Sequence, residues 1–134
     1  MALDASFVEL EYGGGANEPD YWASQSYAKA KETVAEIRNT AKTAYQRHQI
    51  SNAIENFKTA VHILRKCQLK NDAEQKEQEE TLIAVYTSLA VCYNSWHTPE
   101  AAFNSVNEIR RLCDINQNAK VLYQEGKALL KLGD

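Results

Sequence analysis

The stretch T-S-L-A-V-C-Y-N-S-W-H-T-P-E-A-A, from Thr87 to Ala102, holds the pattern that decides the fold. Its first half spaces apolar residues as one face of a helix does. Thr98-Pro99 then supplies an N-cap residue followed by proline at the first position of a new helix. Ala90 and Ala102 lie twelve residues apart, one on each side of this break. Because small side chains let two helix backbones approach closely, the stretch predicts a tight helical hairpin with these alanines facing each other.

The same spacing recurs along the chain. Ala41 and Ala53 are also twelve residues apart, and Gly126 follows Ala90 by thirty-six residues, close to the ~34-residue period of tetratricopeptide repeats. The step from Ala41 to Ala90 is forty-nine residues, and the excess falls in the polar stretch 70–80. We therefore predict an insertion there that adds turns to the helix after it.

The predicted fold is all-α: a tetratricopeptide-repeat superhelix of about two and a half helical hairpins, with a short extended N-terminal arm. Residues 22–134 form the repeat domain, whose third repeat is truncated because the chain stops after one helix. Residues 1–21 form the arm, in which Phe7 to Tyr12 alternates apolar and charged residues before Gly13 to Gly15 interrupts it. This arm is either the tail of a preceding domain or a segment that packs on the helices. Apolar periodicity predicts helices at about 22–48, 50–66, 82–93, 98–112 and 116–132.

The composition excludes several classes of protein. A net charge of -3 gives no reason to expect nucleic acid or an acidic membrane surface as a partner. No apolar run approaches the ~18 residues that span a bilayer, and the N-terminus has no signal-peptide pattern. The three cysteines are far apart and form no C-x-x-C pair, which favours reduced, helix-packing thiols of a cytosolic or nuclear protein: Cys67, Cys92 and Cys113. Of the two compartments we expect the cytoplasm.

No catalytic motif is visible, so the chain is predicted not to be an enzyme and to bind neither cofactor nor metal. Gly-rich phosphate loops, H-E-x-x-H and G-x-S-x-G are all absent from the sequence. The acidic run 74–80 is interpreted as a solvated helix face. Scattered histidines are interpreted as surface or packing residues: His48, His62 and His97. Three tyrosines fall at core spacing and are assigned to packing: Tyr45, Tyr86 and Tyr93.

The remaining functional surface is the groove lined by the first helix of each repeat. Residues one turn from the packing positions would project into it, and they are Arg38, Lys42, Ser88, Lys120 and Gln124. Arg38 and Lys42 are spaced i,i+4, so both cations face one way. Cations make charge-assisted hydrogen bonds to carboxylates, so this groove is predicted to bind an acidic peptide that ends in a free carboxylate.

Three motifs make the chain resemble the repeat domains of the large FK-type immunophilins, which are co-chaperones. Arg38 to Lys42 (R-N-T-A-K) lies where that family has K-x-x-G-N, and Ser88 to Tyr93 (S-L-A-V-C-Y) looks like N-L-A-x-C-Y. Lys120 to Ala128 looks like K-A-L-Y-R-R-G-K-A. The insertion after the first repeat is similar to the one in that family. The resemblance covers roughly residues 33–134. Within this branch we expect the germline immunophilins of the shutdown type, which act in silencing by Piwi-interacting RNAs.

The resemblance implies a carboxylate clamp for the acidic C-terminal tail of heat-shock protein 90. This chain keeps Lys120, offers Arg38 in place of a lysine, and departs from the family at Lys42, Ser88 and Gln124. Losing the arginine at Gln124 removes a fork-shaped donor and about 1.5 to 3 kcal/mol of charged hydrogen bonding. We therefore expect weakened or altered tail binding.

Two other functions stay open. One is a scaffold or homodimer module in which the clamp has degenerated and the last helix or the N-terminal arm mediates dimerisation or binds another protein. The other is enzymatic and concerns only a full-length parent protein with an isomerase domain, because an isomerase pocket cannot fit into the residues before Trp22.

Overall fold

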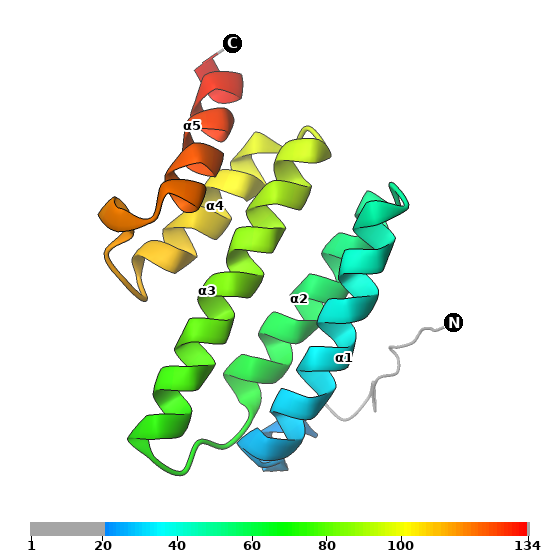
Figure 1. The fold of residues 1–134 in the computed structure, drawn as a ribbon, viewed down its shortest axis with the longest axis vertical. Coiled ribbons are helices and arrows are strands. Elements are labelled where there is room, and N and C mark those ends of the chain that lie inside the picture. Colours follow the sequence, from blue (N-terminus) through cyan, green and yellow to red (C-terminus); the bar gives the residue numbers. More distant parts are fainter. Residues whose placement is uncertain (1–20, 134) are drawn as a thin grey trace.

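The computed structural model describes residues 21–133, and these residues form five α-helices and two short 3-10 segments (Figure 1). The predicted extended arm at residues 1–21 lies outside this range except for Tyr21. The all-α class is confirmed for the described part of the chain. The elements in chain order are η1 (Trp22–Ser24), α1 (Tyr27–Gln46), α2 (Ile50–Lys66), α3 (Asp72–Ser95), α4 (Pro99–Arg110), η2 (Ile115–Gln117) and α5 (Ala119–Gly133).

Two antiparallel hairpins and a fifth helix make up the architecture, as expected for tetratricopeptide-like repeats. Helix α1 packs mainly on α2, and α3 packs mainly on α4. Helix α2 also packs on α3, and α5 lies against α4 and α3 (Figure 1). The predicted register is confirmed in both hairpins, since four small residues are fully or almost fully buried: Ala41, Ala53, Ala90 and Ala102.

The polar insertion adds turns to α3, as predicted. This helix begins at Asp72, where the Asn71 side chain accepts a hydrogen bond from the Glu74 backbone N–H at 2.9 Å. Both hairpin turns contain a histidine with positive φ, His48 at 63° and His97 at 62°. A non-glycine residue in this region is uncommon and marks a sharp reversal, which explains why the helices end there.

Three local expectations need correction. The first α-helix starts at Tyr27, because Trp22–Ser24 forms a 3-10 segment and Ser26 caps α1. Thr98 is the N-cap residue of α4, but its hydroxyl donates back to the Tyr93 carbonyl at 3.0 Å and caps no N–H. The repeat spacing predicts Gly126 at a packing position of α5, but the residue is exposed, with open space where a Cβ would point.

The cysteines are free thiols, as expected. Cys67 and Cys92 are buried and Cys113 is half-buried. Burial raises the pKa of Cys67, and it raises the pKa of Cys92 to about 11. No helix in residues 21–133 is both long and apolar enough to cross a bilayer.

Candidate functional site

Helices α1 and α3 are the first helices of the two hairpins, and two hydrogen bonds join them across the face that they share. Near one end, Lys31 Nζ donates to Glu77 Oε2 at 2.7 Å. Near the other end, the Tyr45 hydroxyl lies 3.1 Å from Ser95 Oγ. These contacts show which side of each helix faces its neighbour, so helical periodicity places the residues between them.

Arg38 lies midway between the two bridges on α1. It is seven residues from both Lys31 and Tyr45, and a seven-residue step is close to two helical turns. Its side chain is half-buried, and its Nε atom is buried without a hydrogen-bond partner among the described residues. A buried donor without an acceptor costs free energy, so this guanidinium has one donor that residues 21–133 leave unsatisfied.

Ser88 lies on the matching side of α3, seven residues before Ser95. The side chain is half-buried, and its hydroxyl makes no hydrogen bond to another residue of the 21–133 segment. Lys42 is exposed one turn beyond Arg38 and has no ion-pair partner in that segment. The structure therefore brings Arg38, Lys42 and Ser88 to one side of the α1–α3 pair.

Gln124 brings α5 onto this face, but it is more buried than a free groove residue would be. Only 7% of the residue is exposed. Asn94 Nδ2 on α3 donates to Gln124 Oε1 at 2.9 Å and to the Gln124 carbonyl at 3.1 Å. The amide carbonyl of Gln124 is thus used as a link between helices, while its Nε2 remains available as a donor. Lys120 is exposed one turn earlier on α5.

Asn94 is the residue that sequence reasoning missed. Its Oδ1 is buried and has no partner within the described chain, although its Nδ2 makes two hydrogen bonds. An amide flip would turn Oδ1 toward the Gln124 carbonyl, which accepts and cannot donate, so the observed orientation is the favourable one. No sequence pattern marks this residue, because the contact depends on how α5 docks on α3.

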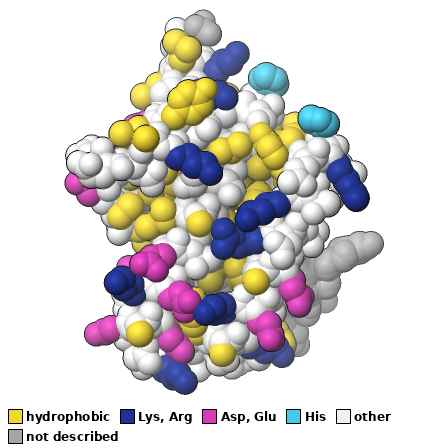
Figure 2. Space-filling view, viewed as in Figure 1, with side chains coloured by type: hydrophobic (Ala, Val, Ile, Leu, Met, Phe, Trp, Pro, Cys, Tyr) yellow, Lys and Arg dark blue, Asp and Glu magenta, His cyan; other side chains and the backbone are white. Residues whose placement is uncertain are grey.

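The two signs of charge are distributed unevenly on the face seen in Figure 2. Dark blue Lys and Arg side chains lie over the centre between α3 and α1, whereas in the lower part magenta acidic side chains alternate with further dark blue ones. At the Lys31–Glu77 pair, the hydrogen bond from Lys31 holds the pKa of Glu77 below its ordinary value. Burial and then the charge of Glu77 raise the pKa of Tyr27 to about 12. Glu77 and Lys31 are therefore paired with each other. Arg38 and Lys42, by contrast, have no acidic partner among residues 21–133.

The residues assigned to packing or surface behave as expected. Tyr86 is buried, and Tyr45 and Tyr93 pack against the core. All three histidines are exposed. The partial burial of the His62 ring, and then the charge of Lys66, lower the pKa of His62. No group of acidic, histidine and cysteine side chains within residues 21–133 could hold a metal ion.

The chain is similar in sequence to two proteins that carry the same name. No protein-family model matches it. The "Inactive peptidyl-prolyl cis-trans isomerase shutdown" of Bombyx mori is 31% identical over 107 residues, covering 80% of this chain and 24% of that protein. The protein of the same name in Drosophila melanogaster is 35% identical over 83 residues, covering 62% of this chain and 18% of its own length.

The chain is therefore related to the shutdown-type immunophilins, which confirms the expected resemblance to that branch. Both relatives are named as inactive isomerases, in agreement with the prediction that this chain is not an enzyme. The chain spans about a quarter or less of the length of these relatives.

Proposed function

We propose that this chain is a non-enzymatic protein-binding module of a co-chaperone in the cytoplasm, and that its α1–α3–α5 face binds the acidic C-terminal tail of a heat-shock protein 90 class chaperone. Arg38, Lys42 and Lys120 bind the carboxylates, and Ser88 and Gln124 add neutral hydrogen bonds. The relationship to the shutdown-type proteins supports a co-chaperone-related role. The cationic side chains of Arg38, Lys42 and Lys120 support the binding of carboxylates.

The observation that carries the proposal is the buried, unpartnered Nε of Arg38. A guanidinium presents its donors in a fixed fork, and a carboxylate can accept two of them at once. Because Nε has no contact with solvent, a tail carboxylate would reach it only if the guanidinium turned outward, and the pair would then satisfy a donor that residues 21–133 leave without an acceptor. Each such charged hydrogen bond contributes about 1.5 to 3 kcal/mol.

The other four residues supply donors of different reach. Lys42 and Lys120 are exposed, so their ammonium groups can follow a flexible peptide. The Ser88 hydroxyl and the Gln124 Nε2 donate from half-buried and buried side chains. Because the side-chain carbonyl of Gln124 is bonded to Asn94 and the side chain carries no charge, we expect affinity below that of a clamp with arginine at this position.

A titration with two forms of one peptide tests the function. An acidic chaperone-tail peptide with a free C-terminus should bind more tightly than its C-terminally amidated form. Lys120→Ala should weaken the free-acid peptide about tenfold, since one charged hydrogen bond is lost. Lys70→Ala is the matched control, because Lys70 is exposed in the loop before α3. Equal binding of both peptides, unchanged by Lys120→Ala, would refute the clamp.

A second candidate function is assembly, and exposed apolar residues on α5 favour it. Leu130 is 73% exposed and Tyr123 is 64% exposed. Leu122, Leu129 and Leu132 are exposed as well, and Figure 2 shows yellow apolar side chains over α5 at the upper left. Contiguous apolar surface of this kind marks interaction sites. In this role the chain is a scaffold or homodimer module with a degenerate clamp, in the Piwi-interacting RNA silencing that the resemblance implies.

Light scattering over a concentration series tests assembly. The wild-type mass should rise toward that of a dimer, and Leu130→Glu should return it to the monomer. Lys70→Glu reverses a charge away from α5 and should leave the mass unchanged. A wild-type chain that stays monomeric at every concentration would count against this function.

A further inference from the structure

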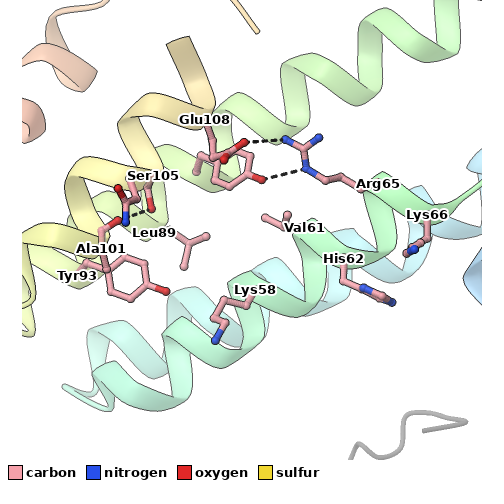
Figure 3. Close-up of a pocket in the computed structure, with 12 residues that line it drawn as sticks. Lys58, Val61, His62, Arg65, Lys66, Leu89, Tyr93, Ala101, Ser105 and Glu108 are labelled. Carbon is pink, nitrogen blue, oxygen red and sulfur yellow. Dashed lines mark hydrogen bonds and ion pairs between the residues drawn. The ribbon is translucent and has the colours of Figure 1, made fainter. Parts of the chain in front are cut away.

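A groove of about 530 Å³ lies between α2 and α4, with α3 as its floor. Figure 3 shows its lining side chains, which come from these three helices. Leu89 and Tyr93 face it from α3, and they lie about 100° and about 140° around the α3 axis from Ser88, because each residue advances the helix by about 100°. The groove is therefore a different surface from the α1–α3–α5 face.

The centre of the groove is apolar. Val61 from α2 and Leu89 and Tyr93 from α3 line it, and Ala101 from α4 leaves it open. The Tyr93 hydroxyl makes no hydrogen bond to another residue of the described segment. The phenol is a protonated donor at neutral pH, and burial raises its pKa further. An aliphatic or aromatic side chain fits this centre, with one polar group beside it.

The α2 edge of the groove is basic. Lys58, His62 and Lys66 follow one another at four-residue steps, which places them in one row along the helix. Lys66 has no ion-pair partner among residues 21–133, and Lys58 has only Glu55 at 3.7 Å, an exposed pair. Exposed pairs of this kind contribute little, so both ammonium groups are available to a ligand.

The acidic side chain that lines the groove is already bound. Glu108 accepts from Arg65 Nη2 and from Arg111 Nη1, each at 3.4 Å. Arg65 also donates its Nε to the Tyr86 hydroxyl at 3.0 Å and lies over that ring. The dashed lines in Figure 3 trace this link from α2 across to α4. It closes one end of the groove and leaves the charge of the edge positive.

We propose that this groove binds an acidic segment of a partner protein, in which an apolar side chain enters between Val61, Leu89 and Tyr93 while neighbouring Asp or Glu carboxylates pair with Lys58 and Lys66. Complementary charge selects such a segment over a basic or neutral one. The site recognises side chains and does not need a chain end. It is independent of the proposed function, which needs a free C-terminal carboxylate on the other face.

Fluorescence anisotropy with a short, labelled peptide of alternating Glu and Leu, blocked at both ends, tests the proposal. Wild type should bind it, and the double variant Lys58→Glu, Lys66→Glu should bind about tenfold more weakly. Asn104→Trp places a large side chain at an exposed groove position and should also block binding without disturbing the core. The double variant Lys42→Ala, Lys120→Ala is the matched control on the other face and should bind normally.

Two results would overturn the proposal. One is equal binding of a peptide in which every Glu is replaced by Gln. The other is an affinity that neither the charge reversal nor Asn104→Trp changes, while circular dichroism shows both variants folded. A groove occupied by a second copy of the chain would appear as a dimer that Asn104→Trp dissociates, and this too would overturn it.

Discussion

Asn94→Ala should loosen α5 from the rest of the molecule. The substitution removes two hydrogen bonds to Gln124, at 2.9 and 3.1 Å, each contributing about 1 kcal/mol. It also removes the buried, unpartnered Oδ1, whose desolvation cost offsets part of this loss. We expect the free energy of unfolding to fall by about 1 kcal/mol net, after correction for the gain in helix propensity.

Urea denaturation measures this change, and Asn104→Ala provides the correction. Asn104 is an exposed asparagine inside α4, so its replacement carries the same propensity gain without an interhelical bond. The double variant with Gln124→Ala should show a coupling energy of about 1 kcal/mol, because both single variants remove the bond from Asn94 Nδ2 to Gln124 Oε1, whereas Gln124→Ala keeps the backbone carbonyl. Hydrogen exchange should accelerate in α5 before it does in α1 or α2.

A corrected loss below about 0.3 kcal/mol, together with zero coupling between Asn94 and Gln124, would refute the reasoning. That result would mean that α5 is held by its buried apolar residues alone, chiefly Val121 and Ala128. The position of Lys120 relative to α3 would then not depend on the amide contact.

Three further predictions concern stability. Ala102→Leu should lower the free energy of unfolding by about 1 to 3 kcal/mol in urea denaturation, because this fully buried residue lies in the α3–α4 hairpin; no loss would contradict the close approach. Gly126→Ala should raise it by about 0.5 to 1 kcal/mol, since the new methyl group enters open space within a helix; destabilisation would mean that this position is packed. Burial raises the pKa of Cys92 from 9.0 to about 11, so its stabilising effect is complete below pH 9 and is lost as the pH rises toward 11. Urea denaturation at several alkaline pH values should show Cys92→Ala with a shallower decline than wild type, and identical slopes would argue against this thiol as the cause.

The prediction from sequence succeeds where a single helix or hairpin determines the outcome. Small residues twelve apart identify the hairpins because their burial depends on local spacing, and Ala90 with Ala102 shows this. The insertion joins α3 because its residues favour helix and Asn71 caps it. The predicted start of the first helix near Trp22 is wrong because Ser26 caps α1, and apolar periodicity alone does not show where a cap lies.

Local spacing along the chain is enough to predict the all-α class, the repeat register and the helices that carry the five site residues, because these depend on residues near one another in the chain: Arg38, Lys42, Ser88, Lys120 and Gln124. Packing between helices then sets the hydrogen-bonding state of those side chains. Helix docking buries Arg38 Nε without a partner and commits the Gln124 carbonyl to Asn94. It also forms the basic groove over Tyr93. These outcomes depend on contacts between residues far apart in sequence, and no local spacing encodes them.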